Sequence, residues 1–431
     1  MVEALIKKIF NKNIHYNILS LVNVFIGFLF ILYLGRKFGA GSETDIYFLS
    51  MVIISYLGYF VQSVWEAMSP YYVELKIKDK KLSGELYSIL LNDLILVALF
   101  IISIYFIITS NFNIITFEQK QFLDVFIFYL IFQNILFLNK TVLNLEHFYA
   151  SFYIVDIFVY MGLFLSIYLY DDILYIAYIS ILFTFLANIW QFYLVFKKVD
   201  IRYSFKIYNK NIKEIYKNSF KLKIGSLFYG SKDIIIASVF TSFGTGAYSL
   251  YSYANKFAGV ILQVVNAPIV NIFATKANYL IANKEYEKLQ ENIKKVLLQT
   301  TILFVSSTII TYFILPYILN VLFGDKFSTN DIILIREIFL IMSVFYLVLV
   351  YQSPYGRMLS MFKLFNFGII SNIIFFFVLI INYIIFQFFE YEYLLFLKIT
   401  ILAKLIQFIY VYCILRSVIF DSIGKYNEKK Y

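Results

Sequence analysis

The chain has 431 residues and a formal net charge of +10, and 61% of its residues are hydrophobic whereas 15% are charged. Soluble domains carry about 25% charged residues, so this composition excludes an ordinary soluble fold and favours an all-α polytopic membrane protein. With a single cysteine, Cys413, and two distant histidines, His15 and His147, no disulfide framework and no metal or haem centre is expected.

Twelve apolar stretches follow one another along the chain, each close to the roughly 20 residues that span a bilayer. Asp171 and Asp172 alone divide the fifth from the sixth, which predicts a tight hairpin there. The stretches are Ile18 to Leu34, Ile46 to Met68, Leu86 to Ile108, Phe122 to Leu145, Phe152 to Tyr170, Ile173 to Val195, Phe220 to Phe240, Ala247 to Phe273, Val296 to Leu322, Ile332 to Val350, Ile369 to Phe388 and Leu394 to Ile414.

The positive charges predict the topology. With the N-terminus in the cytoplasm, most of the 37 lysine and arginine residues fall in cytoplasmic segments, among them Lys140. This positive-inside bias predicts a multi-pass protein of the inner (cytoplasmic) membrane with both termini cytoplasmic, and it accounts for the net charge without nucleic acid. The cations assigned to the outside are Arg36, Lys37, Lys120, Lys326, Arg336 and Lys398.

Two glycine-rich turns indicate an internal repeat. Residues 38–41 (Phe-Gly-Ala-Gly) follow the first stretch, and residues 243–246 (Phe-Gly-Thr-Gly) follow the seventh. The halves would then be two six-helix bundles, residues 1–198 and 220–431, related by a pseudo-two-fold axis along the membrane normal. Residues 199–219 between them are expected to be a basic cytoplasmic linker, either a helix on an anionic leaflet or a topology anchor.

Several ionisable residues fall within the apolar stretches, where a charge costs about 2.5–3.5 kcal/mol and so needs a reason. Lys232 and Asp233 are adjacent and point about 100° apart on a helix, so we expect each to meet a partner on another helix or in a cavity. Lys256, next to Asn255, is expected to be a cavity cation, whereas Lys404 could equally reach the interface.

Arg36 and Asp45 complete the candidate substrate-binding set, Arg36 at the outer mouth. For Asp45 a structural explanation competes, because residues 42–45 (Ser-Glu-Thr-Asp) have the pattern of a helix N-terminus. Asp93 and Asp156 are the acids within the first half. The chain holds no phosphate-binding loop and no catalytic constellation, so neither an enzyme nor a cofactor is expected.

Residues 35–48 (Gly-Arg-Lys-Phe-Gly-Ala-Gly-Ser-Glu-Thr-Asp-Ile-Tyr-Phe) resemble the turn after the first span in the MurJ/MviN family of lipid-linked oligosaccharide flippases. Residues 242–246 with 251–256 resemble the corresponding turn and Tyr-Ala-Asn segment of the second half, and Leu322-Phe323-Gly324 with Asp331 also fits. The family belongs to the same superfamily (MOP) as the Wzx polysaccharide flippases and the multidrug antiporters.

The resemblance implies a flippase that moves a polyprenyl-diphosphate-linked oligosaccharide by alternating access. The first stretch lacks the arginines of lipid II flippases, Lys256 stands in place of another, and twelve spans replace the usual fourteen. A polysaccharide or O-antigen-type repeat unit, as in lipopolysaccharide synthesis, is therefore the expected substrate. Lipid II transport and cation-coupled drug antiport through Asp93 and Asp156 remain the alternatives. Expected partners are membrane lipids and a glycan polymerase or glycosyltransferase complex.

Overall fold

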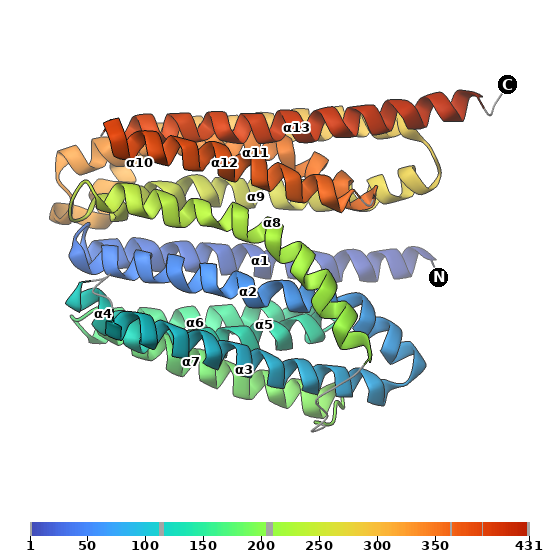
Figure 1. Ribbon diagram of the computed structural model, residues 1–431, viewed down its shortest axis with the longest axis horizontal. Coiled ribbons are helices and arrows are strands. Elements are labelled where there is room, and N and C mark those ends of the chain that lie inside the picture. Colours follow the sequence, from blue (N-terminus) through green and yellow to red (C-terminus); the bar gives the residue numbers. More distant parts are fainter. Residues whose placement is uncertain (1, 112–115, 204–209, 363, 390, 429–431) are drawn as a thin grey trace. The chain divides into compact units, whose positions relative to one another are not determined.

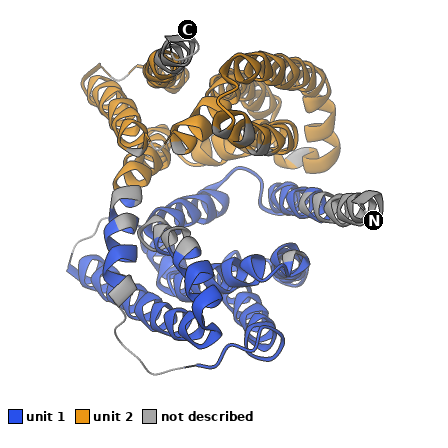
Figure 2. Ribbon diagram, turned by 90° about the vertical axis from the view of Figure 1, so that its right-hand side faces the viewer, with its two compact units in different colours: residues 1–223 blue, residues 224–431 orange. Residues whose placement is uncertain are grey.

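The computed structural model describes residues 2–111, 116–203, 210–362, 364–389 and 391–428. Within these ranges the chain forms helices and no strand (Figure 1). The expectation of an all-α fold is confirmed. The chain divides into two compact units, residues 1–223 (unit 1) and residues 224–431 (unit 2) (Figure 2).

Unit 1 is built from six long helical segments, of which the fourth is broken into α4 and α5 around Ile127 and Phe128. No proline or glycine marks this break in the sequence. The helices are α1 (Val2–Phe38), α2 (Ser42–Lys78), α3 (Lys80–Asn111), α4 (Phe117–Phe126), α5 (Tyr129–Leu145), α6 (Tyr149–Leu169), α7 (Leu174–Tyr193) and the short π-helical η1 (Leu194–Lys198).

Six further long helices follow. The first of them, α8, begins in unit 1 and ends in unit 2. They are α8 (Lys210–Thr241), α9 (Ala247–Ala282), α10 (Tyr286–Phe323), α11 (Thr329–Met361), α12 (Phe365–Phe389) and α13 (Tyr393–Glu428), with the short 3-10 helix η2 (Gly324–Lys326) between α10 and α11.

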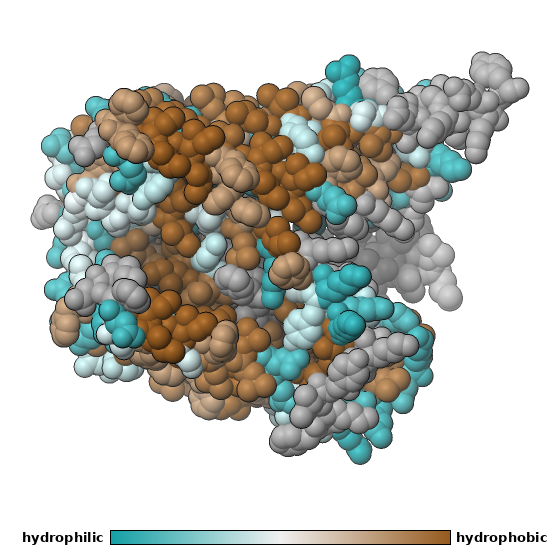
Figure 3. Space-filling view, in the orientation of Figure 1, coloured by the Kyte–Doolittle hydropathy of each residue, from teal (hydrophilic) through white to brown (hydrophobic). Residues whose placement is uncertain are grey.

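Ten helical stretches among the described residues are long and apolar enough to cross a membrane. They comprise α1, α3, the α4–α5 pair, α6, α7 and α9 to α13; the predicted second and seventh spans lie in α2 and α8, outside this set. Large apolar side chains cover much of the surface in view (Figure 3). Phe100 is 66% exposed and Phe388 is 80% exposed. Such a surface suits lipid rather than water, so the chain is a multi-pass membrane protein.

The helices of the two units pack in the same pattern. In unit 1, α1 packs on α6, α2 on α3 and α5, α5 on α3 and α7, and α6 on α7. In unit 2, α9 packs on α10 and α11, α11 on α10 and α13, and α12 on α13. The remaining pair also corresponds, because α8 contacts α12 through Phe228 with Phe376 and Tyr229 with Phe375. The helices α1 to α7 and the helices α8 to α13 therefore share one packing pattern.

The two glycine-rich turns occupy equivalent corners of these repeats. Gly39, with φ +71°, joins α1 to α2, while Gly244 and Gly246, with φ +112° and +88°, join α8 to α9. Glycine reaches this left-handed region without the steric cost of a Cβ atom. The glycines that mark the repeat in the sequence are therefore needed for the backbone conformation of the two corners.

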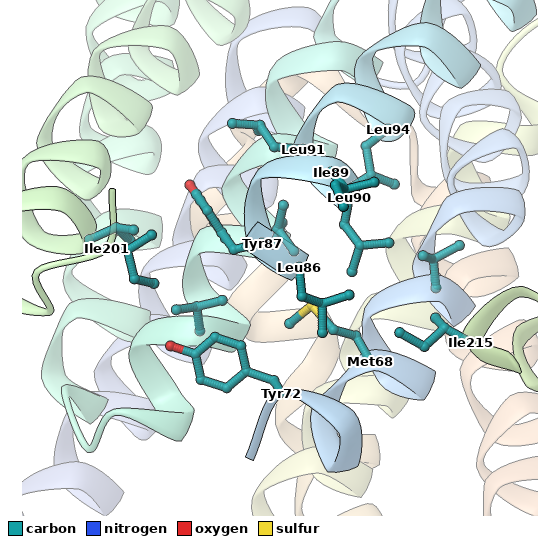
Figure 4. Packing of buried hydrophobic residues seen from close by; sticks show 14 of the residues in the cluster. Met68, Tyr72, Leu86, Tyr87, Ile89, Leu90, Leu91, Leu94, Ile201 and Ile215 are labelled. Atoms are coloured by element: carbon teal, nitrogen blue, oxygen red, sulfur yellow. The ribbon is translucent and has the colours of Figure 1, made fainter. Parts of the chain in front are cut away.

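Residues expected to form a linker between the bundles contribute to the core of unit 1. Val199, Ile201, Ile212 and Ile215 are buried in one apolar cluster with residues such as Met68, Tyr72, Leu86 and Tyr87 (Figure 4). From Lys210 onward this segment is the first part of α8. Ile212 and Ile215 lie three residues apart on one helical face, so they can be buried while the lysines around them remain outside.

The short connection between α6 and α7 carries its own polar contacts. Lys37 of α1 donates hydrogen bonds to the carbonyl oxygens of Ile167 and Tyr170 at the end of α6, and its Nζ lies 2.9 Å from Asp171. Asp172 accepts a hydrogen bond from the backbone N–H of Leu174. Lys37 thus satisfies carbonyl groups that the end of a helix leaves without partners.

Candidate functional site

Lys232 and Asp233 form an ion pair with each other inside unit 2. The Nζ atom of Lys232 lies 2.8 Å from Oδ1 of Asp233, and the Lys232 side chain is 11% exposed. The expectation that these neighbours could not pair was wrong. The backbone directions of adjacent helical residues differ by about 100°, but the four-carbon stem of lysine is long enough to bring its ammonium group back around the helix.

Lys404 of α13 is enclosed completely, with 1% of its surface exposed. The Lys404 side chain therefore does not extend to the membrane interface, which was the possibility that the sequence left open. Its Nζ donates a hydrogen bond of 2.7 Å to Oε1 of Gln407, whose amide donates one of 2.7 Å to Asn372 of α12. Asn372 in turn donates to the carbonyl oxygen of Gly225 in α8, at 3.1 Å. This chain of hydrogen bonds ties α13 to α12 and α12 to α8.

Three aromatic rings surround the two buried ammonium groups. The Nζ atom of Lys404 lies 4.7 Å from the ring centre of Tyr229, 5.5 Å from that of Phe375 and 6.0 Å from that of Phe345. The Nζ atom of Lys232 lies 5.4 Å and 5.8 Å from the Tyr229 and Phe345 rings. The faces of aromatic rings attract cations within about 6 Å, so these rings partly replace the lost hydration.

Unit 2 therefore holds more buried positive than negative charge at this place. Asp233 pairs with Lys232, whereas no carboxylate in the described part of the chain lies within 4.0 Å of the Lys404 ammonium. The two ammonium groups also interact electrostatically with each other, and this interaction is repulsive. A buried charge without a counter-ion is costly, which makes the cluster a place where an anion would be stabilised.

Side chains from α9 and α11 extend the cluster. The hydroxyl of Tyr346 donates a hydrogen bond of 2.7 Å to Asn255. Lys256, the next residue, is exposed and close enough to Asp233 for their charges to interact. The hydroxyl of Tyr251 is buried without a hydrogen-bond partner and also interacts electrostatically with Lys232. The structure thus brings together Lys232, Asp233, Asn255, Lys256 and Lys404 of the sequence-predicted set.

The other two predicted residues, Arg36 and Asp45, belong to unit 1, at the corner between α1 and α2. Arg36 is exposed in the last turn of α1, and Asp45 is 6% exposed in the first turn of α2. Thr44, rather than Asp45, makes the side-chain cap, because its hydroxyl accepts a hydrogen bond from the N–H of Gly41 at 3.0 Å. An acidic residue in a first helical turn is also favoured by the helix dipole, as the sequence pattern indicated.

Unit 1 contains a buried ion pair that the sequence reasoning missed. The Nζ atom of Lys140 in α5 lies 2.6 Å from Asp156 in α6 and 4.3 Å from the ring centre of Phe152. Asn23 of α1 donates a hydrogen bond of 3.2 Å to the second oxygen of Asp156. Lys140 lies within α5 and is 2% exposed. The available signal was a pair of opposite charges within two successive apolar stretches.

Asp93, the other acid expected in the first half, connects α3 to the beginning of α8. It accepts a hydrogen bond of 2.7 Å from the hydroxyl of Tyr216, and the neighbouring Asn92 accepts one of 2.6 Å from Tyr203. Among the described residues no group of three histidine, cysteine, aspartate or glutamate side chains could hold a metal ion.

Comparison with known proteins rests on structure, because no protein-family model and no curated sequence matches the chain. The structure is similar to "Lipid II flippase MurJ, inward closed conformation", with a TM-score of 0.77 at 18% identity over 94% of this chain and 87% of that one. It is also similar to an inward-facing multidrug resistance MATE transporter of the MOP superfamily, with a TM-score of 0.75 at 10% identity over 93% and 96% of the two chains. The fold is that of the MOP-superfamily transporters.

A MATE structure in complex with MaL6 shares the MOP fold as well, with a TM-score of 0.68 at 12% identity over 95% of this chain and 96% of that one. These structures are transporters rather than enzymes. The cationic, aromatic and unpaired hydroxyl groups of the polar cluster in unit 2 suit a ligand that carries both an anionic group and polar oxygens.

Proposed function

We propose that this protein is a flippase that moves a polyprenyl-diphosphate-linked oligosaccharide across the cytoplasmic membrane by alternating access. The observation that carries the proposal is the surplus of buried positive charge formed by Lys232 and Lys404 around the single carboxylate Asp233. A diphosphate group would supply the missing negative charge. Similarity to the fold of a lipid II flippase supports the same class of substrate.

The aromatic and amide groups of the cluster would receive the sugars. Tyr251 offers a buried hydroxyl without a partner, and Asn255 has amide hydrogens that can donate to sugar oxygens. The exposed Lys256 would meet the headgroup first, and the enclosed Lys404 would hold the positive charge in place behind it. The polyprenyl tail would remain in lipid, where the apolar surfaces of the helices can contact it.

In this mechanism the two repeats rock so that the site opens alternately to the two sides of the membrane. Export carries the diphosphate, and therefore negative charge, from the cytoplasm to the outside. An inside-negative potential then favours export by about 2.3 kcal/mol for each charge and 100 mV. Arg36 and Asp45, at the corner between α1 and α2, are proposed contacts late in the cycle. A glycan polymerase or glycosyltransferase complex would be the partner that uses or supplies the glycan.

Transport of an anion can be tested with reconstituted protein and a fluorescent polyprenyl-diphosphate oligosaccharide in liposomes. Lys404→Gln is expected to reduce the rate of flipping at least tenfold, because it removes a buried charge worth several kcal/mol to an anion. Lys398→Gln is a matched control, since Lys398 lies on the same helix but is exposed. Equal flipping by Lys404→Gln and wild type would disprove the proposal.

A second candidate is cation-coupled drug antiport, for which the MATE structures and the partly buried Asp156 provide the grounds. It predicts the opposite charge preference. If neither the wild type nor Lys404→Gln flipped the oligosaccharide, and Asp156→Asn abolished efflux of a cationic dye, the antiporter would replace the flippase.

A further inference from the structure

Arg336 is an arginine on the outer surface of a membrane-spanning helix. The positive-charge pattern assigned it to an outside segment, but it lies in the second to third turn of α11, which begins at Thr329. On the same helix, Ile333 and Leu340 are 52% and 46% exposed. They lie three residues before and four residues after Arg336, so they share its face. Arg336 therefore occupies an otherwise apolar surface.

Tyr312 of α10 fixes the orientation of the arginine. The guanidinium carbon of Arg336 lies 3.9 Å from the ring centre of Tyr312, which is the distance of close stacking. Tyr312 is flanked by exposed apolar residues of α10, since Ile309 is 51% exposed and Phe313 is 63% exposed. Stacking holds the planar guanidinium in one orientation and leaves the hydrogen-bond donors at its edge available.

No group of the described chain neutralises Arg336. No carboxylate there lies within 4.0 Å of its guanidinium, and its Nε atom is buried without a hydrogen-bond partner. The adjacent Glu337 makes no ion pair with Arg336 within 4.0 Å and is exposed. Thr308, one turn before Tyr312 on α10, has a buried hydroxyl that also lacks a partner. The pair of helices thus presents a fixed cation and unpaired donors.

A bilayer centred on the apolar stretch of α11 would place its phosphates close to Arg336. The apolar stretch of α11 has 31 residues, or about 46 Å of helix, whereas the hydrocarbon layer is about 30 Å thick. About 8 Å of helix therefore reaches the headgroup layer at each end. Arg336 lies about 10 Å from the beginning of α11, at the boundary between hydrocarbon and headgroups. The anion available at that depth is a phosphate.

We propose that Arg336 and Tyr312 form a binding site for the phosphate group of a bilayer phospholipid on the surface shared by α10 and α11. The guanidinium donates charge-assisted hydrogen bonds to the phosphate oxygens, and the acyl chains lie along the exposed apolar residues of both helices. This site is separate from the polar cluster, and it would hold a lipid whether or not the protein transports an oligosaccharide.

The test uses the delipidated full chain in a non-ionic detergent, titrated with phosphatidylglycerol and monitored by native mass spectrometry. The wild type is expected to retain one phosphatidylglycerol molecule more tightly than a phosphate-free glycosyl diacylglycerol. Arg336→Gln should weaken that binding about tenfold or more, because a hydrogen bond to a charged group is lost. Tyr312→Leu should weaken it less, and Tyr312→Phe should preserve it.

Lys326→Gln is the matched control, since Lys326 is an exposed cation in η2 at the same end of unit 2. If Arg336→Gln and Lys326→Gln lost phosphatidylglycerol equally, or if neither lost any, a defined site at Arg336 would be refuted. The same titration with a polyprenyl diphosphate distinguishes the source of the phosphate. Loss of polyprenyl diphosphate binding in Arg336→Gln, with phosphatidylglycerol binding unchanged, would overturn the assignment to a bilayer phospholipid.

Discussion

The ammonium groups of Lys232 and Lys404 lie over the same two aromatic rings, those of Tyr229 and Phe345, although they come from helices α8 and α13. One of them has a carboxylate partner and the other has an amide. Lys404 is therefore the lysine at which a single small substitution can change the charge of the cluster.

Gln407→Glu should supply Lys404 with the carboxylate that it lacks. Glutamate has nearly the same shape as glutamine, so the contact with the Lys404 ammonium at 2.7 Å would become an ion pair. We expect a higher unfolding temperature and slower flipping of an anionic substrate, because the charge is then neutralised internally. Gln387→Glu, at an exposed position of α12, is the control. Unchanged stability and unchanged flipping would contradict the proposed role of Lys404.

Tyr251→Phe should separate binding from stability. The Tyr251 hydroxyl has no hydrogen-bond partner although the residue is 3% exposed, so its removal should leave the unfolding temperature unchanged or slightly raised. Substrate flipping should nevertheless fall if the hydroxyl receives the ligand. In contrast, Tyr346→Phe removes a hydrogen bond of 2.7 Å to Asn255 and should lower stability by about 1 kcal/mol. Thermal unfolding and the liposome assay on both variants distinguish these outcomes.

Removing one partner of the Lys140–Asp156 ion pair should lower stability more than replacing both residues with apolar ones. Asp156→Asn leaves the buried Lys140 without its partner and should lower the free energy of unfolding by about 3–5 kcal/mol, whereas Lys140→Met leaves the partly exposed Asp156 unpaired and should cost less. The double variant Lys140→Met with Asp156→Leu should recover most of that loss. Unfolding monitored by tryptophan fluorescence in detergent measures all three. Additive losses in the double variant would show that the two groups do not act as a pair.

Gly162→Ala should destabilise the contact between α6 and α7. A Cβ atom at Gly162 would lie 2.2 Å from the ring of Phe183, so the helices would have to separate. Overpacking of this kind costs about 1–3 kcal/mol. At Gly356, which is exposed in α11, a Cβ atom meets nothing within 4 Å, and alanine should stabilise the helix by up to about 1 kcal/mol. Equal unfolding temperatures for the two variants would refute the close approach at Gly162.

Ten of the twelve predicted spans lie in helices that are long and apolar enough to cross a membrane, because a bilayer requires about 20 apolar residues from each crossing helix. The sequence predicted the two corners because Gly39 and Gly244 adopt backbone angles that other residues avoid. It did not reveal that Lys140 is buried, because a charge count along the chain registers position and not packing. It also missed the break between α4 and α5, since Ile127 and Phe128 are residues that normally continue a helix.

The sequence predicted individual residues of the candidate site but not the contacts between them. Lys232, Lys256 and Lys404 stood out because each is a charge within an apolar stretch. Their relation to one another depends on Tyr229, Phe345 and Phe375, which are apolar or amphipathic residues in a chain rich in such residues. The direction taken by a long lysine side chain also depends on its surroundings, which is why the pairing with Asp233 could not be derived from helix geometry alone.

Helix α8 begins among the buried residues of unit 1, at Ile212 and Ile215, and passes Lys232 in unit 2 before it ends at Thr241. Ile215 and Lys232 are separated by about 25 Å of uninterrupted helix. The sequence of α8 therefore meets two separate demands, because Ile212 and Ile215 must fit the apolar core of unit 1 while Lys232 must meet Asp233 and the ring of Tyr229.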